Sequence, residues 1–93
     1  MIGITIQDVD DAKSKQLNIP VGIEVLDVET GKAGDKAGIE VKDIIIKFDG
    51  KTVKNGSELN ALKSKHKFGD SVKITVNRAG KEKELTIKFV KQS

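Results

Sequence analysis

Alternating apolar and polar residues near the start of the chain predict a β-strand with one buried face. Isoleucine occupies every second position of residues 2–7, and a period of two is the spacing at which side chains share one face of a strand. Residues 10–17 then predict a short helix with Asp10 or Asp11 as its N-cap. That helix ends before Pro20, because a residue that precedes proline leaves the helical region.

Further strands follow from the same pattern. Residues 22–28 predict a strand whose irregular phase indicates a bulge. Three consecutive isoleucines within residues 43–48 indicate a strand that is buried on both faces. Asp49-Gly50 predicts a tight turn into a short strand at residues 51–53. The final predicted hairpin joins alternating strands around Ile74 and Ile87 through Ala79-Gly80.

Two helical segments lie between these strands. One turn around Asp35-Lys36-Ala37 precedes Gly38, which suits the left-handed position after a helix. The main helix is predicted to begin at Ser57 as its N-cap, with Leu59 and Leu62 on its apolar stripe. A domain with this order of elements is β-rich and capped by one or two helices, and a partly closed barrel or sandwich accommodates its short strands.

Composition supports one small globular domain. The chain has 93 residues and no cysteine, so disulfides and thiolate metal sites are excluded. Eleven isoleucines and nine valines favour sheet over helix. No apolar run is long enough to span a bilayer, and no charged-then-apolar leader opens the chain, so we expect neither a membrane span nor a signal peptide in it.

Charge is unevenly distributed. The net charge is +3, but residues 1–50 hold six lysines against ten acids and residues 51–93 hold eleven basic residues against four acids. A basic half is compatible with nucleic-acid binding. However, Arg78 is the single arginine and only three aromatic residues are present, whereas base stacking and base readout rely on aromatic and arginine side chains. A solvated lysine surface is the favoured interpretation, and nucleic-acid binding stays an alternative.

Enzyme chemistry finds little support in the sequence. His66 is the single histidine and stands between two lysines, which indicates an exposed side chain rather than a catalytic one. The acids at residues 8–11 lack the glycine and distal glutamate of a calcium loop. Gly50-Lys51-Thr52 imitates the end of a phosphate loop, but Ile45 stands where that motif needs glycine. We therefore expect no catalytic residue, no metal site and no cofactor in this chain.

Gly3 raises a physical question, because glycine weakens the head of an otherwise apolar strand. A strand edge would explain it, and so would a backbone turn whose amides bind an anion. The chain resembles PDZ domains, and the resemblance covers essentially its whole length. The matching segments are Met1-Ile2-Gly3-Ile4, Ala37-Gly38-Ile39, Asp43-Ile44-Ile45, Asp49-Gly50 with Val53, Phe68 to Val72 and Arg78 to Lys81.

The order of the segments resembles the permuted PDZ domains of HtrA-type bacterial serine proteases. The resemblance implies an α+β fold over residues 1–93, a partly open barrel or sandwich of five to six strands with one main helix and one or two short ones. It implies that a peptide C-terminus adds as an antiparallel strand. The residues implied to bind the carboxylate are Ile2, Gly3 and Ile4. Those implied to line the groove are Thr5, Ile6, Asn55, Leu59 and Leu62.

The implied function is substrate recognition or regulation in a cell-envelope or periplasmic protease, with catalysis on another domain of the same parent chain. The implied partners are C-terminal peptides or unfolded proteins with an apolar last residue. Scaffolding or oligomerisation within another membrane or processing protease remains an alternative. The basic second half suggests a preference for acidic residues upstream in the ligand. One departure is Lys42, which replaces the family's usual glycine and costs about 1 kcal/mol if its backbone is left-handed.

Overall fold

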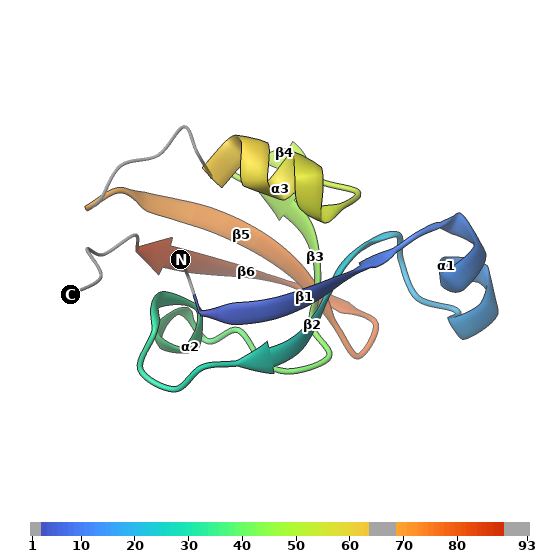
Figure 1. Cartoon of the computed structure of the whole chain (residues 1–93), viewed down its shortest axis with the longest axis horizontal. Helices are drawn as coiled ribbons and strands as arrows, with labels where there is room; N and C mark the ends of the chain where they lie inside the picture. The colour runs from blue at the N-terminus through green and yellow to red at the C-terminus, as the bar shows by residue number, and fades with distance from the viewer. Residues whose placement is uncertain (1–2, 64–68, 89–93) are drawn as a thin grey trace.

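The computed structural model describes residues 3–63 and 69–88 (Figure 1). Ile2, His66, Phe68 and Phe89 lie outside the described residues. The elements in chain order are β1 (Ile4–Val9), α1 (Asp11–Leu17), β2 (Gly22–Val28), α2 (Ala33–Ala37), β3 (Ile44–Phe48), β4 (Lys51–Thr52), α3 (Gly56–Lys63), β5 (Ser71–Arg78) and β6 (Lys81–Lys88). None of these helices is long and apolar enough to cross a membrane.

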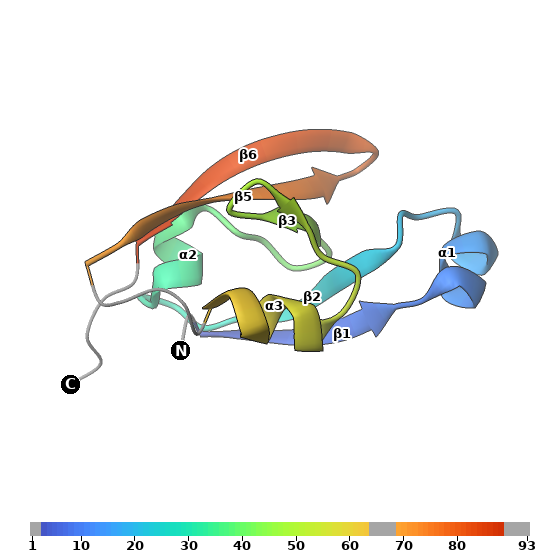
Figure 2. The same cartoon turned by 90° about the horizontal axis from the view of Figure 1, so that it is seen from above.

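The six strands form one antiparallel sheet in the order β1-β2-β3-β5-β6, with the two-residue β4 paired to β3. β1 and β6 stand at opposite ends of this order, so the sheet is not closed (Figures 1 and 2). One longer helix and two short helices accompany the sheet. The predicted β-rich α+β architecture with a partly open sheet is therefore confirmed.

The predicted bulge lies where β1 pairs with β2. Thr5 is opposite Asp27 and Ile6 is opposite Val25, so Leu26 is the extra residue on β2. An extra residue bends its strand and increases the local twist.

Backbone conformations confirm the predicted turns. Asp49 and Gly50 have φ values of 57° and 76°, and Ala79 and Gly80 have φ values of 53° and 85°. Two successive positive φ angles are what a two-residue hairpin of right-handed twist requires. The hairpins β3–β4 and β5–β6 therefore have the register that their turns impose.

The short helices also have the predicted ends. The Asp10 side chain accepts a hydrogen bond of 2.9 Å from the Lys13 amide and caps α1. Asn18 follows α1 with a φ of 56°, and Gly38 follows α2 with a φ of 94°. Each left-handed residue stops its helix and satisfies a carbonyl of the last turn.

The core lies between the sheet and the helices. Ile44 and Ile45 are both buried, as predicted for consecutive isoleucines of a two-faced strand, whereas Ile46 is half-buried. The buried apolar cluster is made of Ile23, Val25, Ala33, Ile39, Ile45, Phe48, Val53, Leu59, Val72, Ile74, Val76 and Ile87. Seven of these twelve side chains are valine or isoleucine from strands, which is the use that the composition predicted for them.

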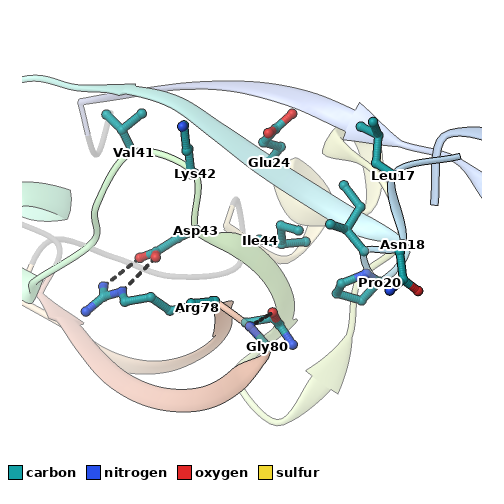
Figure 3. Close-up of a pocket in the computed structure, with 13 residues that line it drawn as sticks. Leu17, Asn18, Pro20, Glu24, Val41, Lys42, Asp43, Ile44, Arg78 and Gly80 are labelled. Carbon is teal, nitrogen blue, oxygen red and sulfur yellow. Dashed lines mark hydrogen bonds and ion pairs between the residues drawn. The ribbon is translucent and has the colours of Figure 1, made fainter. Parts of the chain in front are cut away.

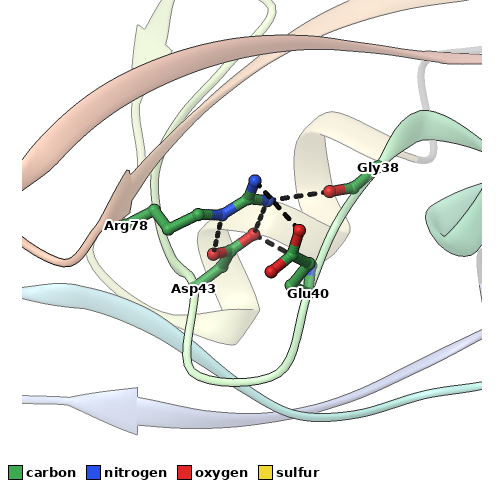
Figure 4. A network of polar contacts seen from close by, with 4 residues as sticks. All are labelled: Gly38, Glu40, Asp43 and Arg78. Carbon is green, nitrogen blue, oxygen red and sulfur yellow. Dashed lines mark hydrogen bonds and ion pairs between the residues drawn. The ribbon is translucent and has the colours of Figure 1, made fainter.

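A polar network holds the connection between α2 and β3 (Figure 4). Asp43 is 1% exposed and receives two hydrogen bonds of 2.7 Å from Arg78 of β5. Arg78 also donates to the Gly38 carbonyl at 2.7 Å and lies 3.2 Å from a Glu40 oxygen. Hydrogen bonding to Asp43 raises the pKa of Arg78, which outweighs the opposing effect of desolvation. Next to this network Lys42 has a φ of 78°, so the left-handed backbone that the resemblance implied is present.

Candidate functional site

The outer edge of β1 is open in the described part of the chain. β1 pairs with β2 on one side and stands at the end of the strand order. α3 runs alongside β1 in the opposite direction, so α3 begins near the end of β1 (Figure 2). An open strand edge presents a row of backbone donors and acceptors to which another chain can pair.

Gly3 makes a turn immediately before β1. Its φ is +72°, a conformation that L side chains rarely adopt. A methyl group at this position would lie 2.4 Å from Cβ and 2.6 Å from Cγ of Lys32. Both the backbone angle and the close approach of the loop before α2 therefore require glycine here, which answers the question that its position in the sequence raised.

The Gly3 turn directs one backbone amide toward the open edge. The Glu29 N–H donates to the Gly3 carbonyl at 2.7 Å, so this carbonyl faces the β2 side. The carbonyl and the following N–H of a trans peptide point in opposite directions. The N–H of Ile4 therefore points away from β2, where an incoming acceptor could receive its hydrogen bond.

The predicted site residues of β1 alternate as expected. Ile4 and Ile6 are half-buried and pack against the core, whereas Thr5 is exposed. On α3, Leu59 is 1% exposed and belongs to the core, while Leu62 is half-buried against it. Ile4, Ile6 and Leu62 thus retain exposed apolar surface beside the edge. Ile2, the remaining predicted carboxylate-binding residue, lies outside the described residues.

Asn55 caps the start of α3, a role that the sequence predicted for Ser57. The Asn55 side-chain oxygen accepts a hydrogen bond of 2.9 Å from the Glu58 amide, and a Glu58 oxygen accepts one of 2.7 Å from the Lys54 amide. The prediction of Ser57 as the N-cap is therefore wrong: α3 begins at Gly56 and Asn55 caps it. The sequence Asn55-Gly-Ser-Glu58 fits a capping box, and that pattern could have identified the cap.

Asp8 is a site residue to which the sequence assigned no role beyond membership of the acidic group at residues 8–11. Its Oδ1 accepts a hydrogen bond of 2.8 Å from the Gly56 amide, which joins the end of β1 to the start of α3. Negative charge at a helix N-terminus is favourable. No local pattern reveals this contact, because the two residues are 48 positions apart in sequence.

Other recesses offer less chemistry. A pocket of about 520 Å³ lies between the end of α1, the start of β3 and the β5–β6 turn (Figure 3). Its apolar lining includes Leu17 and Val41, and both of its carboxylates are already paired, Glu24 with Lys13 and Asp43 with Arg78. Within residues 3–63 and 69–88, no three His, Cys, Asp or Glu side chains gather closely enough to hold a metal ion.

Comparisons with known proteins agree with this arrangement. The family described as "PDZ domain" matches residues 1–89. The chain is 38% identical over 72 residues to the "Serine protease Do-like HtrA" of Lactobacillus helveticus, covering 77% of this chain and 17% of that protein. It is 38% identical over 90 residues to a "Probable periplasmic serine endoprotease DegP-like" of Rickettsia conorii, covering 95% and 18%. The chain thus spans less than a fifth of the length of these relatives.

Solved structures share the fold. The "HtrA-type protease AlgW with decapeptide" superposes with a TM-score of 0.84 at 19% identity, covering 100% of this chain and 30% of that one. The HtrA3 PDZ domain, solved with a phage-derived ligand of sequence FGRWV, superposes with a TM-score of 0.81 at 23% identity, covering 95% and 82%.

Proposed function

Because the chain belongs to the PDZ domain family, of the kind found in HtrA-type serine proteases, we propose that it captures the carboxyl-terminal ends of peptides along the open edge of β1. The observation that carries this proposal is the turn at Gly3, which directs the Ile4 N–H away from β2 at the head of an unpaired strand edge. A terminal carboxylate is the acceptor that such a turn suits, because it brings negative charge to backbone donors.

The side chains beside the edge suggest which last residue fits. Ile4, Ile6 and Leu62 are half-buried apolar groups, so an apolar side chain placed among them would remove further apolar surface from water. Leu59 supports this wall from within the core. We therefore propose an apolar last residue, held by its carboxylate at Ile2, Gly3 and Ile4 and by backbone pairing along Thr5 and Ile6.

In this proposal Asn55 positions α3 and does not bind the ligand directly. Its side-chain oxygen is occupied in capping α3. Its contribution is then to hold the start of α3 at the end of β1, together with the Asp8 bond to Gly56.

The relatives suggest a setting for the domain. Their names describe serine proteases, some of them periplasmic, and each of these proteins is more than five times as long as the matched segment. We propose that this domain recognises substrates or regulates activity in an envelope HtrA-type protease, and that another part of the parent performs catalysis. The alternative is a scaffold module that contacts other subunits without binding peptide ends.

Titration with peptides of five to seven residues ending in valine or leucine tests the proposal. Amide resonances followed by NMR should shift at Ile4 to Ile6 and around Leu62, and amidation of the peptide terminus should abolish the shifts. Equal binding of the acid and the amide would refute carboxylate recognition. Absence of any binding would favour the scaffold role, and binding of an oligonucleotide instead would favour the nucleic-acid alternative.

A further inference from the structure

The segment that contains β1 is acidic although the whole chain is basic. Residues 3–29, which contain β1, α1 and β2, hold six acidic residues and two lysines, whereas the full chain has a net charge of +3. The acids are Asp8, Asp10, Asp11, Glu24, Asp27 and Glu29. A ligand strand added to β1 would therefore lie next to a segment with a net charge of −4.

The geometry of β1 places these charges relative to such a ligand. If the last residue of an antiparallel peptide lies opposite Ile4, each residue upstream lies opposite the next residue of β1. The fourth residue before the last then lies opposite Asp8. Residues directly opposite each other in an antiparallel pair have side chains on the same face. The Asp8 side chain faces α3, since it bonds to the Gly56 amide at 2.8 Å, so the opposing ligand side chain also points there.

Further acids lie beyond and beside this position. Asp8, Asp10 and Asp11 line one recess of about 460 Å³ at the end of β1, and Lys54 is the basic residue in its lining. On the other face of the sheet, exposed Asp27 is the partner of Thr5 across the β1–β2 pair. A ligand residue opposite Thr5 would lie two strand spacings, about 10 Å, from Asp27, with Thr5 between them.

These acids do not contribute equally to the charge beside the ligand, because one of them is already in an ion pair. Glu24 pairs with Lys13 at 3.2 Å. Asp8 and Asp10 accept hydrogen bonds from backbone amides, which stabilise their charges without cancelling them. Asp8, which stands on β1 itself, is therefore the acid that faces the ligand path most directly.

We propose that the β1 edge selects peptides with lysine or arginine upstream of an apolar last residue, above all at the fourth position before it. This inference rests on the proposed function and names its ligand class. It replaces the expectation of acidic upstream residues, which rested on the charge of residues 51–93. Charges act on a ligand through their distance from it, and Asp8 stands on the strand with which the ligand would pair.

Three heptapeptides with the same apolar last residue test the inference. They carry lysine, alanine or glutamate at the fourth position before the last, and each is also made with an amidated terminus. Binding is measured at about 0.05 M and 0.5 M salt, which differ strongly in electrostatic screening. We expect the lysine peptide to bind about two- to fivefold more tightly than the alanine peptide at low salt, and the glutamate peptide more weakly by a similar factor. High salt should bring the three affinities together.

Variants assign the effect to named charges. Asp8→Asn keeps an oxygen acceptor for the Gly56 amide and removes the charge, and Asp27→Asn alters an exposed side chain. Asp8→Asn should reduce the preference for lysine over glutamate at the fourth position, while Asp27→Asn on the other face of the sheet and Glu82→Gln on the distant β6 should leave it unchanged. Carboxylate-dependent binding with no charge preference would overturn this inference and leave the proposed function intact. Failure of every peptide to bind would overturn both.

Discussion

Replacing Gly3 with alanine should damage the candidate site more than its local stability cost alone implies. The backbone φ of +72° costs an L residue about 1–2 kcal/mol. The new methyl group would also lie 2.4 Å from Cβ of Lys32, whereas carbon atoms pack at about 3.5–4 Å. A Cβ atom does not move when a side chain changes rotamer, so the loop that carries Lys32 must shift by about 1 Å.

That shift reaches the feature on which peptide binding depends. The Glu29 amide, three residues before Lys32, holds the Gly3 carbonyl and thereby directs the Ile4 N–H to the open edge. We expect Gly3→Ala to lose about 2–3 kcal/mol of unfolding free energy, combining backbone and contact terms. Peptide affinity should fall by about tenfold or more, as expected when a charge-assisted hydrogen bond is misplaced.

Gly50→Ala is the matched control. Gly50 has a φ of +76°, but a methyl group there would meet no atom within 4 Å. It should cost about 1 kcal/mol of stability through the backbone alone and leave peptide affinity unchanged. Urea unfolding measures stability, and fluorescence anisotropy with a labelled peptide measures affinity. If Gly3→Ala lost no more stability than Gly50→Ala and bound peptide normally, the reasoning from the Lys32 contact would be refuted.

Four further substitutions test the structure around the site. Lys42→Gly should raise the unfolding free energy by about 0.5–1 kcal/mol in urea titrations, because it relieves a left-handed lysine; a decrease would contradict this. Arg78→Met should lower it by about 3 kcal/mol or more by leaving the buried Asp43 carboxylate unpaired, and a loss below 1 kcal/mol would show that the network contributes little. Asn55→Ala should lower the unfolding free energy by about 1 kcal/mol and Ser57→Ala by only about a few tenths, because Asn55 is the cap. Thermal unfolding measures both, and a larger loss for Ser57→Ala would show that Ser57 is the cap.

Features governed by local physics were predictable from the sequence. Asp49-Gly50 and Ala79-Gly80 select a hairpin turn through their own backbone preferences, and both turns are present. Gly38 ends α2 for the same reason. The end of α1 was predicted from Pro20, whereas the left-handed Asn18 ends it in the structure. The alternation of Ile4 and Ile6 with Thr5 likewise reports which face of the strand is buried, independent of its partners.

Features that depend on distant partners were not predictable in this way. The Asp8 bond to Gly56 and the Arg78 pair with Asp43 join residues 48 and 35 positions apart, so neither leaves a mark within a window of a few residues. The N-cap prediction was wrong for another reason: Asn55 and Ser57 are both good caps, and the hydrogen bond from the Glu58 amide to the Asn55 side chain distinguishes them.

The division of the α3 leucines shows the limit of a periodic pattern. A stripe of Leu59 and Leu62 predicts one apolar face of the helix but does not tell which leucine is fully buried and which lies at the edge of that face. In the structure Leu59 lies in the core and Leu62 at its boundary. The position of β1 relative to α3 determines this difference, and it is a property of the folded chain.

The acidic edge of β1 also bears on how copies of the domain behave toward one another. An unpaired strand edge can pair with the same edge of a second copy, and natural proteins limit such pairing with short edge strands and charged side chains. β1 is six residues long, and two such edges in an antiparallel pair would bring together two segments that each carry a net charge of −4. Their mutual repulsion disfavours self-association in solution, so the edge can stay open without becoming a route to aggregation.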